Sequence, residues 1–202
     1  MKGDVSLSAP GHPQWLPLSL ASEGDVDEAS AAIVDRLVGD VASPDFRDET
    51  VAMVAGMSRI MRRQAEQRRQ DQVLSYAAWM LMASPGLLLP GPVATLCLRP
   101  LAPTDSDDDV IGAATDLGAD RHGDVDVDVI ETRAGRALSV RYRPVKEVDG
   151  LRVVDEHRVV LWPRRDAEMT LELSLYTTDL VEGGLAAEPL LELAHSIDWE
   201  VE

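Results

Sequence analysis

The side chains best suited to catalysis or metal binding are few in this sequence and widely spaced. The four histidines lie in separate segments, and no two have the short spacing of a metal-binding pair; they are His12, His122, His157 and His195. Asp155 stands two residues before His157, which on a strand would put both on one face. No nucleophile elbow, phosphate-binding glycine loop or dinucleotide fingerprint is present. We therefore predict no catalytic residue, no metal and no cofactor.

Two alternatives to that prediction can be weighed from the sequence. A hydrolase with paired carboxylates stays open, because such a pair leaves no local spacing signature. A calcium loop is the other, since Asp124, Asp126 and Asp128 have the alternating start of one. That pattern then fails, because its sixth position is not glycine and Gly135 at its twelfth position cannot supply a carboxylate.

The same aspartates fit the exposed side of a strand. In residues 124–129 they alternate with three valines, so we expect the aspartates to face water and the valines to face a core. If this strand pairs with residues 136–143, Arg141 and Arg143 come to lie opposite the aspartates. Ala134 and Gly135 then form the turn between the two strands.

Two segments are candidate protein interfaces. One is the basic end of a long helix in an otherwise acidic chain, and the other is a leucine-rich connection between two proline–glycine pairs. The candidate residues are Arg62, Arg63, Arg68 and Arg69, and Leu87, Leu88 and Leu89. The basic residues fit equally with a solvated helix end that complements the helix dipole. The leucines either fold under the sheet or form an exposed apolar tip that docks on a partner.

Composition limits the class of protein. The chain has 202 residues, 45% of them hydrophobic but only 4% aromatic, which predicts one domain with an aliphatic core. We expect residues 1–13 to be a flexible tail and residues 14–202 to form the domain. The net charge of −17 repels phosphate backbones, so we predict no nucleic-acid partner and expect a protein partner of basic character. The oligomeric state stays open.

Cysteine and hydropathy patterns bear on the compartment. Cys97 is the single cysteine and lies in an apolar run, so it predicts a small buried side chain and excludes an internal disulfide. No run approaches the 18 or so apolar residues of a membrane helix, and the start of the chain lacks a signal-peptide pattern. We therefore expect a cytoplasmic protein without membrane insertion. The preference for arginine over lysine resembles high-GC bacterial proteomes, including those of actinobacteria.

The strongest structural pattern is an antiparallel meander. Apolar and polar residues alternate in residues 136–143 and 168–176, and an Asp149-Gly150 pair marks a hairpin turn between them. Pro189 opens a closing helix that runs to Ile197, with its apolar side facing the core.

The first half of the chain combines helices and strands. We expect a strand over residues 15–18, and helices over residues 22–38 and 44–69. The buried stripe of the long helix is predicted to be Phe46, Met53, Met57, Ile60 and Met61, although such methionines also suit an adaptable binding face. Apolar runs at residues 73–82 and 93–98 predict central strands, with a helix left open for the first. Ser106 and Asp109 form a capping box for a further short helix.

The order of these elements resembles the PsbP-like fold that is shared with the Ran-binding Mog family and is found in small actinobacterial proteins. The resemblance rests on the early Trp-Leu-Pro strand, on MTLELSLYTTDL at residues 169–180 and on LLELAHSIDW at residues 190–199. It implies an α/β/α sandwich built on an antiparallel sheet. It also implies a non-catalytic adaptor or assembly factor, and it offers no catalytic residues.

The predicted fold is therefore an α+β protein in which an antiparallel meander packs against several helices. The predicted function is that of a non-catalytic adaptor or assembly protein acting through a surface interface. An accessory or chaperone-like component of a bacterial secretion or injection apparatus is one alternative, and neighbouring genes would distinguish it. A small-ligand-binding protein or hydrolytic enzyme with its site between sheet and helices is the other.

Overall fold

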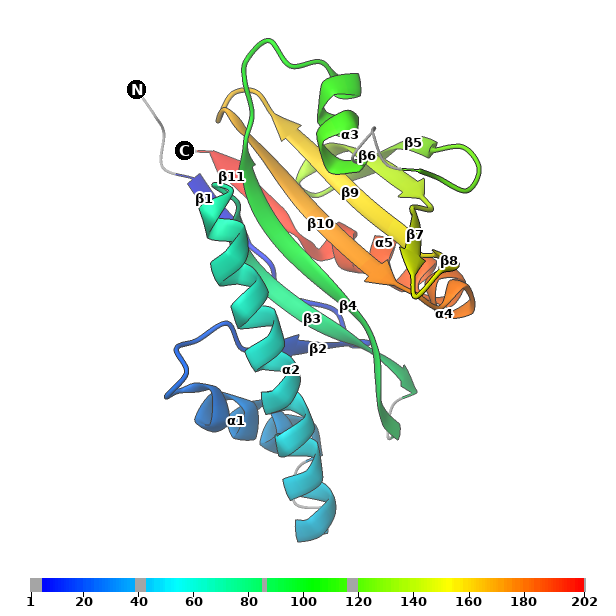
Figure 1. Ribbon diagram of the computed structural model, residues 1–202. Coiled ribbons are helices and arrows are strands. Elements are labelled where there is room, and N and C mark those ends of the chain that lie inside the picture. The colour runs from blue at the N-terminus through cyan, green and yellow to red at the C-terminus, as the bar shows by residue number, and fades with distance from the viewer. Residues whose placement is uncertain (1–4, 39–42, 85–86, 116–119, 202) are drawn as a thin grey trace.

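The fold centres on one antiparallel sheet, seen in a computed structural model that describes residues 5–38, 43–84, 87–115 and 120–201. Seven strands lie in the order β2-β3-β4-β10-β9-β6-β5 (Figure 1). Their bounds are β2 Trp15–Leu18, β3 Leu74–Ser84, β4 Leu87–Pro100, β5 Asp126–Thr132, β6 Gly135–Tyr142, β9 Glu156–Arg164 and β10 Met169–Thr177. The predicted α+β class with an antiparallel sheet is confirmed, and residues 74–84 are strand rather than helix.

Two small sheets complete the strand pairing. β1 (Val5–Ser8) pairs with β11 (Asp198–Val201), and β7 (Val145–Val148) pairs with β8 (Leu151–Val154). The first pair corrects our expectation for the chain start, because residues 5–8 are held against the opposite end of the chain. The second pair is a hairpin inserted into the meander, and it turns at Asp149 and Gly150 as predicted.

The helices pack on the two faces of the sheet. They are α1 Val26–Val38, α2 Pro44–Gln70, α3 Asp107–Thr115, α4 Leu180–Leu185 and α5 Ala187–Ser196. The predicted capping box starts α3, since the Ser106 N–H donates to Asp109 Oδ2 at 2.8 Å and the Asp109 N–H donates to Ser106 Oγ at 3.2 Å. In the described part of the chain, no helix is both long and apolar enough to cross a membrane.

One face of the sheet is covered by α5. The core under α5 is formed by the inward side chains of β9 and β10 and by the apolar side of the helix. The alternation in residues 168–176 and the apolar side of the closing helix predicted this packing. The fully buried members of this core include Val160, Trp162, Leu171, Leu173, Leu175, Leu190, Leu193, Ala194 and Ile197. Trp199 is 5% exposed and joins the same cluster, so it anchors the strand β11 to this core.

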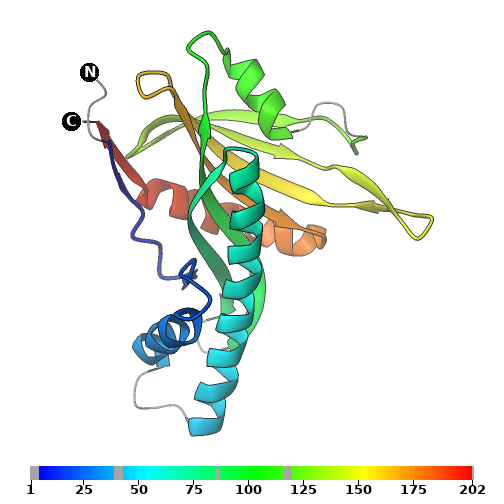
Figure 2. The same ribbon diagram turned by 60° about the vertical axis from the view of Figure 1, so that its left-hand side comes forward.

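The opposite face carries two separate apolar clusters. One lies under α1 and α2 and includes Leu16, Val54 and Met80. The other lies under α3 and includes Val110 and Leu161. In Figure 2, α2 runs along one part of this face while α3 covers another part. The face is therefore covered at its two sides.

The buried side of α2 differs from the predicted stripe. Phe46 and Ile60 are 39% and 47% exposed, whereas Met61 is buried and Met53 and Met57 are partly buried against the same cluster, as predicted. Two small polar residues are buried instead. Thr50 Oγ1 donates to the Phe46 carbonyl at 2.7 Å, and Ser58 Oγ accepts from the Ser19 N–H at 3.1 Å. Both hydroxyls therefore have hydrogen-bond partners in this packing.

Two other local expectations are wrong. Helical spacing predicts that Val26, Ala29, Ile33 and Leu37 form the buried stripe of the first helix, but Leu37 is 45% exposed, and α1 begins at Val26 rather than at residue 22. The sequence also predicts a loop over residues 178–184, but this segment contains α4. Asp179 caps α4, since its Oδ1 accepts from the Val181 N–H at 2.8 Å. An aspartate cap before a single helical turn is a short signal that is easily read as a loop.

The strand predicted from the aspartate–valine alternation is β5, and it pairs with β6 as expected. Arg141 reaches Asp126 at 3.2 Å, as the register predicted. The valines are a correction, because Val127 and Val129 are 42% and 57% exposed. They share a face with Leu138 and Val140 of β6, but the cluster under α3 does not reach them.

Arg143 is also a correction, since it pairs with Glu156 rather than with an aspartate of β5. Glu156 is fully buried and accepts from Arg141 and Arg143 at 3.1 Å each and from Arg158 at 2.7 Å. Burial alone would raise the pKa of Glu156, but the arginines around it hold that pKa below its usual value. Arg158 also donates to the Gly183 carbonyl at 2.9 Å, which ties α4 to the sheet.

The core under α5 gives a direct test of the fold. Leu193→Ala should lower the free energy of unfolding by about 2–5 kcal/mol, because it leaves a cavity in a fully buried cluster. Leu185→Ala, the same change at a side chain that is 73% exposed, should stay within about 0.5 kcal/mol. Urea unfolding followed by circular dichroism measures both, and equal effects would contradict this packing.

Candidate functional site

A strip of the sheet lies between the two covered sides of the α2–α3 face. It is formed by β4 and β10, the third and fourth strands of the order. Its side chains on this face are mostly polar, while the alternate side chains of the same strands are buried leucines and alanine under α5. The polar members are Thr95, Cys97 and Arg99 of β4, and Thr170, Glu172 and Ser174 of β10.

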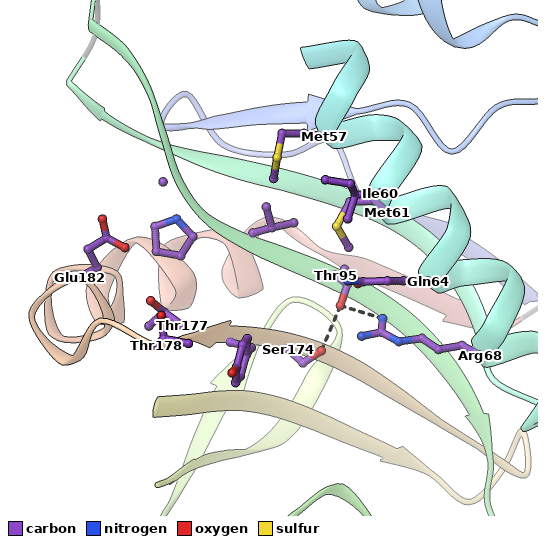
Figure 3. A pocket seen from close by; sticks show the side chains of 14 residues that line it. Met57, Ile60, Met61, Gln64, Arg68, Thr95, Ser174, Thr177, Thr178 and Glu182 are labelled. Atoms are coloured by element: carbon purple, nitrogen blue, oxygen red, sulfur yellow. Dashed lines mark hydrogen bonds between the residues drawn. The ribbon is translucent and has the colours of Figure 1, made fainter. Parts of the chain in front are cut away.

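A groove of about 350 Å³ runs between this strip and α2 (Figure 3). Helix α2 forms one wall, the strip forms the floor, and the end of β10 with α4 closes the far end. Its lining residues are Met57, Ile60, Met61, Gln64, Arg68, Gly91, Pro92, Val93, Thr95, Ser174, Tyr176, Thr177, Thr178 and Glu182. The volume lies within the usual range of ligand-binding clefts.

The helix wall of the groove is apolar and flexible. Met57, Ile60 and Met61 occupy successive turns of α2 beside its buried ridge, so the packing of the helix on β3 fixes where they lie. Ile60 is 47% exposed, which leaves the wall open to solvent. Unbranched methionine side chains adapt to the shape of an occupant. This wall therefore suits an apolar ligand whose shape is not rigidly specified.

The floor of the groove is polar and is organised by one arginine. Arg68 Nη1 donates to Thr95 Oγ1 at 3.1 Å and to Cys97 Sγ at 3.2 Å, and Thr95 Oγ1 lies 3.1 Å from Ser174 Oγ. Figure 3 shows this chain of contacts running from α2 across β4 to β10. Cys97 is fully buried beneath it, as predicted.

Arg68 is less exposed than Arg63 and Arg69, and it differs from the three paired arginines of the same helix. Arg47 pairs with Asp35, Arg59 with Asp27 and Arg62 with Glu23 and Glu66. No carboxylate among the described residues pairs with Arg68. One terminal nitrogen points into the floor, and the remaining guanidinium N–H groups are available as donors to a ligand.

A second cluster borders the groove at Tyr176. Its hydroxyl donates to Asp155 Oδ2 at 2.7 Å, and Lys146 Nζ lies 2.9 Å from the same oxygen and 3.1 Å from the hydroxyl. Burial alone would raise the pKa of Asp155, but the hydrogen bonds from Lys146 and Tyr176 hold it below its usual value. The hydrogen bond to Asp155 raises the pKa of Lys146. The pair is therefore ionised at neutral pH.

His157 lies beside this cluster but does not bond to Asp155. Its Nδ1 is 2.7 Å from the Tyr142 hydroxyl, and its ring packs edge-on against Tyr176 with 4.6 Å between centroids. Burial, followed by the charge of Lys146, lowers the pKa of His157 to about 4. The histidine is therefore neutral at pH 7. Although the sequence places His157 and Asp155 on the same face of a strand, His157 pairs with Tyr142 and not with Asp155.

The structure separates the residues of the predicted interfaces. Of the basic cluster, Arg68 lines the groove, Arg62 is held by two glutamates, and Arg63 and Arg69 are exposed outside it. The side chains of Leu87, Leu88 and Leu89 lie outside the described residues, although the backbone of Leu87 begins β4 and pairs with Ser84.

The β10 and α4 part of the groove escaped the sequence analysis, whereas the sequence leaves open an adaptable binding face at the methionines of its helix wall. The alternation assigns Ser174 only to the polar side of a strand, and the sequence places Glu182 in a loop. The usable signal was the alternation in β10, which gives this strand a polar face although it lies in the middle of the sheet. Among the described residues, no group of three or more metal-ligating side chains comes together.

Comparison with known proteins gives a distant structural likeness. No protein-family profile and no curated protein sequence matches the chain. A solved structure of LpqN, described as involved in cell envelope biogenesis of Mycobacterium tuberculosis, superposes with a TM-score of 0.49 at 12% identity. The match covers 98% of this chain and 84% of that one. A likeness at this level does not transfer a function, and it does not confirm the PsbP-like resemblance.

The buried histidine predicts a specific pH dependence. Because its folded pKa of about 4 is below the unfolded value of 6.5, the unfolded chain binds the proton first as pH falls between these values. The stability that neutral His157 contributes is therefore present above pH 6.5 and is lost as pH falls toward 4. His157→Phe should reduce the loss of unfolding free energy between pH 7 and pH 5 by about 1–2 kcal/mol relative to wild type. Urea titrations at the two pH values measure this, and parallel losses would contradict it.

Proposed function

We propose that this chain is a non-catalytic protein-binding module that holds an extended segment of a partner in the groove between α2 and the β4–β10 strip. The observation that carries the proposal is Arg68, a half-buried cation on the groove floor without a described carboxylate partner, in a chain of net charge −17. In such a chain an unneutralised cation beside an apolar wall favours an occupant that brings its own anionic group.

The dimensions of the groove support an extended segment. Its wall runs from Met57 to Arg68, which at 1.5 Å per helical residue is roughly 16 Å. An extended chain covers that length with about five residues. The exposed Ile60 side chain means that an occupant can enter from the side, without a lid having to open.

The two ends of the groove differ in charge. Arg68 lies at one end, and Glu182 of α4 lies at the other (Figure 3). Apolar side chains lie between them on the helix wall. The occupant that fits best therefore has apolar residues in its middle, a carboxylate that reaches Arg68 and a basic or amide group near Glu182. This polarity would fix the direction in which the segment binds.

Such binding suits an adaptor or assembly protein. A role as an accessory component of a secretion or injection apparatus is a narrower form of the same proposal. The leucines at residues 87–89 stay a sequence-based proposal for a second contact with the partner.

Charge reversal at Arg68 tests the groove. Arg68→Glu should leave the fold intact, since the side chain is half-buried and lies outside the three apolar clusters, but should weaken partner binding about 10- to 100-fold through the loss of a charge-assisted hydrogen bond. Arg63→Glu makes the same charge change on the same helix at an exposed position outside the groove, and should bind normally. Quantitative affinity capture from the native host with each tagged variant provides the comparison.

Comparison with the Arg63→Glu control determines what the affinity capture shows. A partner retained by Arg63→Glu and lost by Arg68→Glu supports the groove. A partner lost equally by both variants, or retained by both, contradicts it.

A small-ligand-binding protein is the second candidate, favoured by the groove volume of about 350 Å³. Under it, an aliphatic carboxylic acid would bind with its carboxylate on Arg68 and its chain along Met57 and Met61. Millimolar hexanoate should then raise the melting temperature of wild type by a few degrees and leave that of Arg68→Glu unchanged. An unchanged wild type would remove this candidate.

A further inference from the structure

The outer edge of the sheet at β5 is built differently from the edge at β2. β2 is four residues long and contains Pro17, which has no N–H to offer a further strand. β5 pairs with β6 in unbroken register over seven residues, from Asp126 opposite Arg141 to Thr132 opposite Gly135. No strand of the described chain pairs with its other side. Edges of regular geometry and this length are usually blunted by proline, a bulge, a cover or charged side chains, and of these β5 has only the charges of Asp126, Asp128 and Glu131.

The side chains of β5 alternate in chemistry as well as in direction. Val127 and Val129, 42% and 57% exposed, extend the apolar face of β6 beyond the cluster under α3. Asp126 and Asp128 point to the other face, and both are exposed. An added strand would therefore find apolar side chains on one face and carboxylates on the other.

The carboxylates of this edge are only partly neutralised. Asp126 is paired with Arg141 at 3.2 Å, and Arg136, opposite Glu131 in the register, is turned to Asp107 at 3.0 Å. Within the described residues, Asp128 and Glu131 have no ion-pair partner. Asp128 is placed to pair with a cation on an incoming strand, whereas Glu131 lies on the face of Val127 and Val129.

A second copy of this chain is a poor occupant of the edge. Antiparallel pairing of two β5 strands over their full length would bring Asp128 opposite Ile130 and Val127 opposite Glu131 of the other copy, so that no carboxylate of β5 meets a cation. Shorter registers centred on Asp128 or Val127 would bring Asp128 opposite itself or opposite Asp126, and like charges directly opposite each other destabilise a strand pair. Two chains of net charge −17 also repel each other at longer range.

We propose that β5 is an interaction surface that accepts an extended basic segment of another protein as an eighth strand of the sheet. The segment alternates lysine or arginine with valine, isoleucine or leucine, so that its cations face Asp128 and its apolar side chains cover Val127 and Val129. Backbone hydrogen bonds of the strand pair supply affinity, and the alternating side chains supply specificity. The proposal does not depend on the groove, which lies on other strands.

A synthetic peptide of alternating lysine and valine provides a direct test. The same peptide with glutamate in place of lysine is the charge-reversed control. The lysine peptide should bind the full chain and protect the amides of residues 126–132 from hydrogen exchange, and binding should weaken as salt is raised. The glutamate peptide should not bind. Asp128→Lys should weaken the lysine peptide at least fivefold and allow the glutamate peptide to bind.

Glu49→Lys, the same charge change at an exposed position of α2, controls for net charge and should leave lysine-peptide binding within twofold of wild type. Four outcomes would overturn the proposal. They are no binding of the lysine peptide, protection outside residues 126–132 only, equal weakening by Asp128→Lys and Glu49→Lys, and dimers of the free chain that pair through β5.

Discussion

The structure depends on a difference between two widths: the sheet is wider than the helices that cover one of its faces. Seven strands about 4.8 Å apart span roughly 29 Å, whereas a packed helix covers about 10 Å. α2 and α3 therefore cover the two sides of this face and leave a strip about one helix wide over β4 and β10. The opposite face, under α5, forms a continuous core. The polar strip and its groove follow from this difference in cover.

The chemistry of the strip follows from its position. Strands in the middle of a sheet that are covered on both faces carry apolar side chains throughout. Because α2 packs mainly on β3 and β2 and α3 mainly on β9, the polar residues Thr95 and Ser174 occupy positions of β4 and β10 that would otherwise hold aliphatic residues, and Thr95 is buried beneath Arg68. Arg68 then reaches over them from α2 and satisfies their hydroxyls, while keeping Cys97 away from solvent. One side chain thus completes the floor of the groove and gives it a positive charge.

Local signals in the sequence predict the parts of this fold that are set by neighbouring residues. The alternation in β6 and β10, the Asp149-Gly150 turn, the capping box at Ser106 and the closing helix all depend on residues close in sequence, and all are confirmed. The groove joins α2, β4 and the end of β10, segments separated by up to about a hundred residues, and no local pattern encodes that meeting. The rotation of α2 was missed for a related reason, since the buried hydroxyls of Thr50 and Ser58 find partners that periodicity does not reveal.

The same limit applies to charge. Arg62, Arg63, Arg68 and Arg69 are equivalent in the sequence, but the fold pairs one with glutamates, exposes two and brings one to the groove. The valines of β5 lie on one face of the strand, as the alternation predicted. They are nevertheless exposed, because α3 is too short to cover that face. Distinguishing such residues requires knowing which helix lies over which strand.

Site-specific photo-crosslinking tests the central claim most directly. A photoreactive amino acid at Gln64, inside the groove wall, is compared in the native host with one at Glu49, which is exposed on the same helix outside the groove. The account predicts a covalent adduct with a single protein at Gln64 and none at Glu49, with the crosslinked residues of the partner in an extended segment that contains an aspartate, a glutamate or a chain-terminal carboxylate. No adduct at Gln64, or the same adduct at both positions, would contradict it.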